Sequence, residues 1–216
     1  MGVLDSINDN LIKSRILASF VDCEATSFNG HCTEIGFAQV WLGRPLTQSP
    51  ATVAAHPDFP SIFIRSNSSL VRVDRWMDDY LKWDPAAEKI TGISRAMVLE
   101  QGKPAQEVAL WLNAELSGLT TYSDAKRHDS NWIDQVFKVA GLKRGFKISQ
   151  VERLTLRCDI DKAEFRAHCD RQFDTLHGEE KPHRAEADAI SWAHVFAKCW
   201  RDVAPKKWSL AKLFGF

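Results

Sequence analysis

The chain has 216 residues, of which 44% are hydrophobic and 26% are charged, so it can bury the core of one large domain. Lysine and arginine together number 28, as do aspartate and glutamate, and this balance argues against a protein that tracks along duplex nucleic acid. Every apolar run is far shorter than a membrane span, so no membrane association is expected.

The cysteines and the two ends of the chain indicate location and domain organisation. The five cysteines are an odd number and include no CxxC pair, which favours a reduced, cytoplasmic protein. Residues 1–15 lack the apolar core of a signal peptide and are expected to form an N-terminal extension. A single domain is expected over residues 16–200. Residues 201–216 are expected to form a basic and aromatic C-terminal tail, whose role stays open.

The first third of the chain is predicted to form strands. Apolar or alternating runs predict strands at residues 16–21, 34–41 and 61–66. The turn "SFNGHC" joins the first two strands. The Pro-rich segment 43–60 predicts a long loop before the third.

The rest of the chain alternates between helices and strands. Pro104 lies near the start of a helix over residues 104–116, and Gly141 follows a helix that Asp129 or Ser130 would cap. Further elements are predicted as strands at 119–124 and 146–150 and as helices at 160–176 and 183–200. This order predicts an α/β fold in which helices flank a mixed β-sheet.

Two carboxylates end the first predicted strand. Asp22 and Glu24 are two residues apart, so they share one face of the strand, where their charges repel each other. A magnesium or manganese ion between them would remove the repulsion, because hard divalent cations prefer oxygen ligands. The alternative is that the strand simply reaches solvent at residue 22.

Further acids and a histidine follow at the ends of later elements. Asp124 ends a predicted strand, and Asp129 begins a predicted helix. His183 precedes Asp188 by five residues, which places the histidine in the entry loop and the acid in the first turns of the last helix. The alternative interpretations are an N-cap for Asp129 and an ordinary surface histidine for His183.

The order of these motifs resembles the DnaQ-like family of 3′–5′ exonucleases, of the DEDDh type, in the ribonuclease H-like superfamily. The match consists of the acid-x-acid pair, "EIG" on the second strand, an acid at the middle helix and HxxxxD at the last one. The segment "AEKITGISRAMV" at residues 87–98 agrees, with Thr91 where the family usually has histidine. The resemblance covers roughly residues 16–198, nearly the whole chain.

The resemblance assigns the site residue by residue. Asp22 and Glu24 match the first motif, Asp129 matches the second, and His183 and Asp188 match the third. The family often has threonine directly after the first-motif glutamate, where this chain has Ala25 followed by Thr26. The second motif carries one extra residue before Asp129, so Asp124 stays an alternative for that acid. Glu34 in "EIG" is expected to be structural.

The resemblance implies hydrolysis of single-stranded DNA or RNA from the 3′ end, with release of nucleoside 5′-monophosphates. Two Mg²⁺ or Mn²⁺ ions would be held by the four acids, with His183 as general base. Contacts with the substrate are expected at Ala25, Thr26, Phe28 and Ile93, the last two as surfaces for base stacking. Core packing is the alternative for Ile93. A homodimer is one expected assembly.

Two other interpretations remain. The chain could be a catalytically silent exonuclease-like module that binds nucleic acid or a protein, which predicts that a site residue is missing. All five are present. It could also be an unrelated α/β domain in which every acid is a helix cap, which requires five coincidences in the right order. The sequence leaves the choice of DNA or RNA and of metal open.

Overall fold

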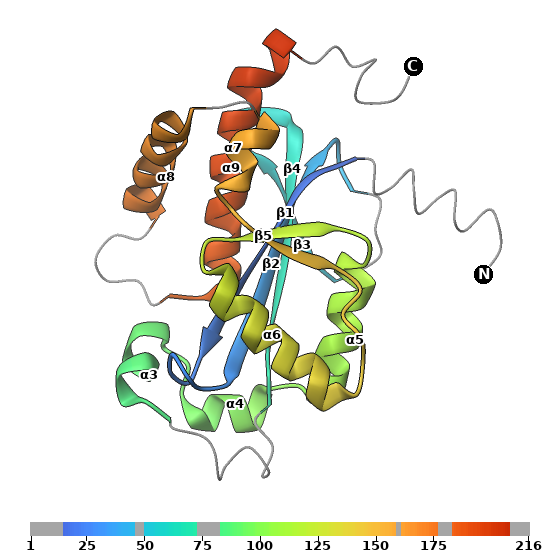
Figure 1. Cartoon of the computed structure of the whole chain (residues 1–216), viewed down its shortest axis with the longest axis vertical. Helices are drawn as coiled ribbons and strands as arrows, with labels where there is room; N and C mark the ends of the chain where they lie inside the picture. Colours follow the sequence, from blue (N-terminus) through green and yellow to red (C-terminus); the bar gives the residue numbers. More distant parts are fainter. Residues whose placement is uncertain (1–14, 46–49, 73–82, 159–160, 177–182, 208–216) are drawn as a thin grey trace, which may run out of the picture.

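The computed structural model describes residues 15–45, 50–72, 83–158, 161–176 and 183–207. A six-stranded sheet forms its centre (Figure 1), with the strand order β3-β4-β2-β1-β5-β6. The strands are β1 (Ile16–Ala25), β2 (Cys32–Leu42), β3 (Thr52–His56), β4 (Phe59–Leu70), β5 (Thr120–Ser123) and β6 (Lys147–Gln150). β1 pairs antiparallel with β2 and parallel with β5, so the sheet is mixed, as predicted.

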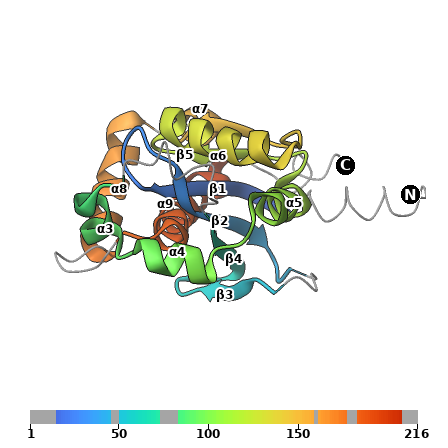
Figure 2. The same ribbon diagram turned by 90° about the horizontal axis from the view of Figure 1, so that it is seen from below.

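Helices cover both faces of this sheet. They are α3 (Pro85–Thr91), α4 (Arg95–Gln101), α5 (Ala105–Leu116), α6 (Lys126–Ala140), α7 (Arg153–Cys158), α8 (Lys162–Leu176) and α9 (Ala185–Lys207). Figure 2 shows α9 and α5 on opposite sides of the central strands. Among the described residues, no helix combines the length and apolarity that crossing a membrane requires.

The central strands are apolar because they are buried on both faces. Phe20 packs with α9 in one core cluster, and its neighbour Val21 packs with α5 and α6 in another. Adjacent residues of a strand point to opposite faces, so one continuous apolar run serves both clusters. β2 is likewise buried from Cys32 to Trp41. The carboxylates of Asp22 and Glu24 therefore follow the most deeply buried part of the sheet.

Most predicted elements are present, and three segments differ from the prediction. The segment 43–60 is not one long loop, because it contains β3, which pairs with β4 at the edge of the sheet. An edge strand with one exposed side lacks a strong apolar pattern, which explains the wrong prediction. The middle helix begins at Lys126 with Ala125 as its N-cap residue, so neither Asp129 nor Ser130 caps it. α9 runs on to Lys207, past the expected domain end at residue 200.

Candidate active site

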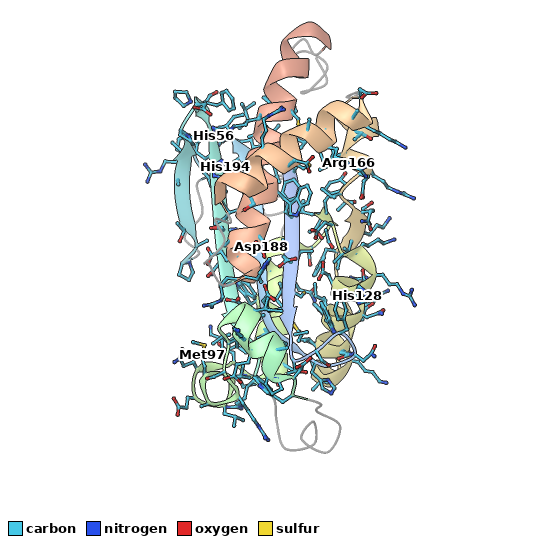
Figure 3. All side chains as sticks on the ribbon, turned by 90° about the vertical axis from the view of Figure 1, so that its left-hand side faces the viewer. His56, Met97, His128, Arg166, Asp188 and His194 are labelled. Atoms are coloured by element: carbon cyan, nitrogen blue, oxygen red, sulfur yellow. The ribbon has the colours of Figure 1, made fainter. Side chains whose placement is uncertain are left out.

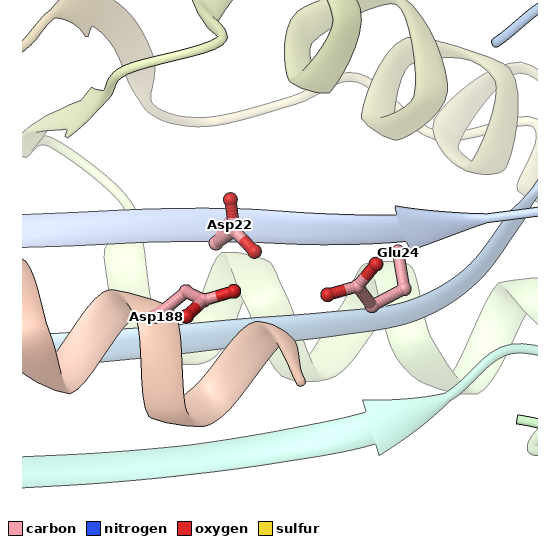
Figure 4. Close-up of side chains that lie close together, drawn as sticks. All are labelled: Asp22, Glu24 and Asp188. Carbon is pink, nitrogen blue, oxygen red and sulfur yellow. The ribbon is translucent and has the colours of Figure 1, made fainter. Parts of the chain in front are cut away.

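Three carboxylates meet at the end of β1. Asp22 and Glu24 project from the same side of the strand, as their spacing predicts, and Asp188 reaches them from the first turn of α9. Each offers a carboxylate oxygen within 4.8 Å of the others. Figure 4 shows the three side chains facing one another between β1 and α9. This arrangement is a candidate site for one divalent cation.

A second acidic group shares Asp22 with the first. Asp124, directly after β5, and Asp129, in the first turn of α6, each offer an oxygen within 4.8 Å of Asp22 and of each other. The structure thus brings both candidates for the second-motif acid to the same place. Asp124 is exposed, and its Oδ1 accepts the backbone N–H of Ala125 (2.8 Å), which leads into the helix.

Asp129 is the more deeply placed of the two acids. It is fully buried, and its Oδ2 accepts a hydrogen bond from the hydroxyl of Ser123. The other carboxylate oxygen, Oδ1, is also buried and has no hydrogen-bond partner among the described residues. Because α6 begins at Lys126, Asp129 is not its N-cap. A buried, half-satisfied carboxylate beside Asp22 is instead typical of a group with a cationic partner.

The acids raise one another's pKa values. Burial raises the pKa of Asp22 well above its usual value, and the charges of Asp129 and Glu24 raise it further. The pKa of Glu24 rises to about 8, first through burial and then through the charge of Asp188. Burial raises the pKa of Asp129 to about 7, although the hydrogen bond from Ser123 opposes this. A bound cation would favour the ionised form of all these groups.

His183 lies two residues before the first residue of α9 and beside Asp188, where the sequence spacing predicts it. Its Nδ1 is 3.5 Å from Asp188 Oδ2. The imidazole is 56% exposed, whereas Asp188 is 14% exposed, so the ring stands at the solvent side of the acidic group. The backbone N–H of His183 donates to the carbonyl of Ile90 (3.0 Å), which ties the loop to α3.

Arg184 is the residue of this site that the sequence analysis missed. It donates two hydrogen bonds to the buried carboxylate of Glu34 on β2, from Nε (2.9 Å) and from Nη2 (2.7 Å). The carboxylate also accepts the N–H of Ala185 (3.2 Å) and the hydroxyl of Ser68 (3.1 Å). Glu34 is therefore structural, as expected. A glutamate inside an apolar strand signals that a cation must pair with it.

Gly36 allows α9 to approach the sheet at this point. A Cβ atom at residue 36 would lie 2.3 Å from the backbone nitrogen of Glu186 and 2.4 Å from the carbonyl carbon of Ala185. Only glycine therefore permits the backbones of β2 and α9 to come so close. In the "EIG" motif, the carboxylate of Glu34 binds Arg184, and the missing side chain of Gly36 leaves room for the backbone of α9. Both features position the helix that carries Asp188.

The residues after β1 form a turn that directly follows Glu24 in the chain. Ala25 is half-buried at the end of the strand. Thr26 is buried, and its Oγ1 accepts the backbone N–H of His31 (3.1 Å), so it holds the turn together. Phe28 is 77% exposed, and its ring stands edge-on to that of His128, with centroids 5.4 Å apart. Phe28 therefore offers an aromatic surface to solvent.

Ile93 does not offer such a surface. It is 1% exposed and packs in a small core cluster with Val98, against Leu70 and Trp83. Its backbone N–H is held by the hydroxyl of Thr91 (3.1 Å). The structure therefore gives Ile93 the core role that the sequence analysis kept as its alternative, and a stacking role for its side chain is not supported.

Comparison with known proteins shows similarity of structure alone. No family model and no curated protein matches this sequence. Escherichia coli Exonuclease I in complex with a dT13 oligonucleotide superposes with a TM-score of 0.56 at 14% identity, over 88% of this chain and 42% of that one. Another Exonuclease I structure gives 0.57 at 13% identity, over 92% and 42% of the two chains.

A third solved structure agrees with these two. Exonuclease I from Methylocaldum szegediense superposes with a TM-score of 0.54 at 16% identity, over 88% of this chain and 41% of that one. The chain thus spans about two fifths of the length of these structures. At such low identity the likeness concerns the fold, which is the ribonuclease H-like mixed sheet with flanking helices that the sequence predicts.

Proposed function

We propose that this chain is a metal-dependent 3′–5′ exonuclease of the DEDDh type, which hydrolyses single-stranded DNA or RNA and releases nucleoside 5′-monophosphates. One observation carries the proposal: Asp22 belongs to both acidic groups. Two cations can therefore be held side by side with Asp22 as their common ligand. Glu24 and Asp188 would complete one site, and Asp129, with Asp124 beside it, would complete the other.

The side chains fit divalent cations of the magnesium or manganese kind. Every candidate ligand is a carboxylate oxygen, which hard cations prefer. The buried Oδ1 of Asp129, which has no hydrogen-bond partner among the described residues, is a ligand atom without another task. When bound, two such ions would neutralise charge on the phosphodiester and stabilise both the attacking and the leaving oxygen.

The chain's own residues supply the proton transfer. His183 takes a proton from the attacking water, and Asp188, 3.5 Å from its Nδ1, stabilises the imidazolium that forms. The water oxygen bonds to phosphorus while the bond from phosphorus to the 3′ oxygen of the preceding nucleotide breaks. That oxygen takes up a proton, and the terminal nucleotide leaves with its 5′-phosphate.

Two further observations support a nucleic-acid substrate. The structures of similar fold include Exonuclease I crystallised with single-stranded oligonucleotides. The exposed ring of Phe28 contacts His128, the residue directly before Asp129, and can stack on a terminal base there. Ala25 and Thr26 would contact the terminal nucleotide through the backbone of their turn. The 3′–5′ direction rests on the match to the family's motifs.

The test is a gel assay on 5′-labelled single-stranded DNA and RNA, with Mg²⁺, with Mn²⁺ and with EDTA. The wild type is compared with Asp22→Asn and with Asp134→Asn, an exposed carboxylate on α6 as the matched control. We expect ladders that shorten from the 3′ end with metal only, unchanged in Asp134→Asn and absent in Asp22→Asn. Cleavage that survives EDTA or the Asp22→Asn change would contradict the proposal.

The catalytically silent binding module is the second candidate. It predicts that the wild type binds the oligonucleotides but cleaves neither under any metal. The presence of all five motif residues, with the four acids in two groups that could each hold a cation, favours the enzyme. An exonuclease domain over residues 16–200, a homodimer and a cytoplasmic location stay predictions.

A further inference from the structure

A groove opens beside the acidic groups, between α7, α8 and α9. Its volume is about 710 Å³. Its lining includes Asp124, Glu152, Lys162, Phe165, Arg166 and Trp192. Figure 3 shows Arg166 on α8, to one side of Asp188 on α9.

The groove is continuous with the candidate active site through two residues. Asp124 lines the groove and also belongs to the second acidic group. Trp192 lines the groove and lies one helical turn after Asp188 on α9. Trp192 also donates a hydrogen bond to the carboxylate of Asp124. A cation or phosphate bound at the second acidic group would therefore lie next to the groove.

The proposed chemistry indicates on which side of the site the retained strand lies. His183 and Asp188 belong to the side where the water is deprotonated. Phosphoryl transfer proceeds in line, so the leaving 3′ oxygen lies opposite the attacking water. Asp124 and Asp129 join Asp22 in the other acidic group, so we assign the leaving oxygen to their side. The leaving oxygen carries all of the strand that remains after cleavage.

We propose that the groove between α7, α8 and α9 binds the retained part of the single strand, on the 5′ side of the scissile phosphate. This inference rests on the proposed function and adds to it the path of the substrate. The terminal nucleotide lies on the side of Glu24, and the nucleotides before it run past Asp124 into the groove.

The walls of the groove suit a nucleic-acid strand. Lys162 and Arg166 are both exposed, and they are four residues apart on α8, so they lie on the same face of the helix and can pair with successive phosphates. Phe165 and Trp192 stack against each other, with ring centroids 6.4 Å apart, and give the floor an aromatic character. Asp124, Glu152 and Asp170 also line the groove, so its acids outnumber the two basic residues. Phosphate binding is therefore confined to the Lys162 and Arg166 face of α8, and the weak net attraction suits a strand that must advance after every cleavage.

Binding without catalysis is the first test. The full-length protein is titrated in EDTA with 5′-fluorescein oligothymidylates of about four and about twenty nucleotides, and anisotropy gives each Kd. The variant is Lys162→Glu/Arg166→Glu. The matched control is Lys143→Glu/Lys147→Glu, which makes the same change of charge in the loop after α6 and at the first residue of β6. Both control lysines are exposed.

We expect the α8 double variant to bind the long oligomer at least about tenfold more weakly, because two phosphate contacts are replaced by repulsion. The affinity for the short oligomer should change little, and the control variant should bind both oligomers with the Kd of the wild type. Equal loss in the α8 variant and the control would overturn the proposal, and so would equal loss for the two lengths.

A second test uses the wild type alone, so it does not depend on the folding of a variant. A photoreactive 4-thiothymidine is placed about four nucleotides from the 3′ end. The cross-linked peptide is then identified by mass spectrometry. A cross-link within residues 151–170 supports the groove, whereas a cross-link confined to α3 or α4 overturns it.

The failure of this inference can be told apart from failure of the proposed function. Suppose that the wild type degrades oligonucleotides and that the α8 variant still prefers the long oligomer over the short one by the same ratio of Kd values. Then only the proposed path of the strand through the groove is wrong. If the wild type cleaves nothing in the gel assay, the proposed function itself fails, and the inference that rests on it fails with it.

Discussion

Arg184 and Glu34 form a two-point ion pair that fastens the start of α9 to β2. The contacts are 2.9 Å from Nε to Oε2 and 2.7 Å from Nη2 to Oε1, and the Glu34 side chain is 2% exposed. Glu34 is the cross-strand partner of Glu24. The same pair therefore holds the helix that carries Asp188 and lies beside a candidate cation ligand. Burial raises the pKa of Glu24 most, the charge of Glu34 raises it further, and the charge of Arg184 opposes this with a smaller effect.

Removing the arginine should destabilise the protein and displace α9. In Arg184→Met the carboxylate of Glu34 stays buried without its cation. We expect the free energy of unfolding in urea to fall by about 2 kcal/mol, less than for a fully buried pair because Arg184 is 38% exposed. The double variant Glu34→Gln/Arg184→Met should recover part of this loss. If it is as unstable as the sum of the single variants, the two residues are not coupled.

Gly36→Ala should impair the site more than it impairs the fold elsewhere. The new Cβ would meet the backbone of Ala185 and Glu186, so α9 must move away from β2. We expect weaker binding of Mn²⁺ in calorimetry, because Asp188 moves with the helix. Gly141→Ala is the control: its φ is +65°, which costs about 1 kcal/mol of strain, but no atom crowds its Cβ. Equal metal binding by both variants would contradict the role of Gly36.

The acidic cluster should make the metal-free protein less stable as pH rises. The pKa of Glu24 increases from 4.5 to about 8 on folding, so the folded state binds more protons than the unfolded state between these values. The protonated Glu24 carboxyl therefore contributes its full stabilisation below pH 4.5, and this stabilisation is lost as pH rises through 8. We expect the melting temperature in EDTA to fall from pH 5.5 to pH 8, and to fall less in Glu24→Gln.

Adding a divalent cation should reverse this loss. Binding to the folded state alone raises stability by mass action, so the melting temperature at pH 8 should rise with Mn²⁺ concentration in the wild type. Glu24→Gln should respond only at higher concentration. A melting temperature that is insensitive to Mn²⁺, or a metal response unchanged by the substitution, would show that the carboxylates do not hold a cation.

A separate pH effect of opposite sign should come from His194. Burial lowers its pKa to about 4, and the nearby His56 and Lys198 add to this, whereas Asp58 opposes it. The unfolded state therefore binds more protons than the folded state between pH 6.5 and 4, and stability falls as pH drops through this window. We expect His194→Leu to remove about 1 kcal/mol of the stability difference between pH 7 and pH 5. Parallel pH profiles for the two proteins in urea unfolding would exclude this role.

The sequence determined those features that depend on spacing along the chain. The alternation of side chains in a strand places Asp22 and Glu24 on one face. The helical rise places His183 before Asp188, and both placements agree with the structure. The apolar runs of the central strands were equally clear, because strands buried on both faces need them. β3 was missed because an exposed edge strand has no such pattern.

Only the tertiary structure decided which residues from distant segments meet. Glu34 clearly needed a cation, but its partner Arg184 lies 150 residues away in the sequence, and no local rule selects it among 28 basic residues. The sequence left Asp124 and Asp129 as alternatives for the second-motif acid. The structure brings both acids close to Asp22, because β5 pairs in parallel with β1. Sheet pairing and helix packing are non-local contacts, so their outcome is set by how the whole core closes.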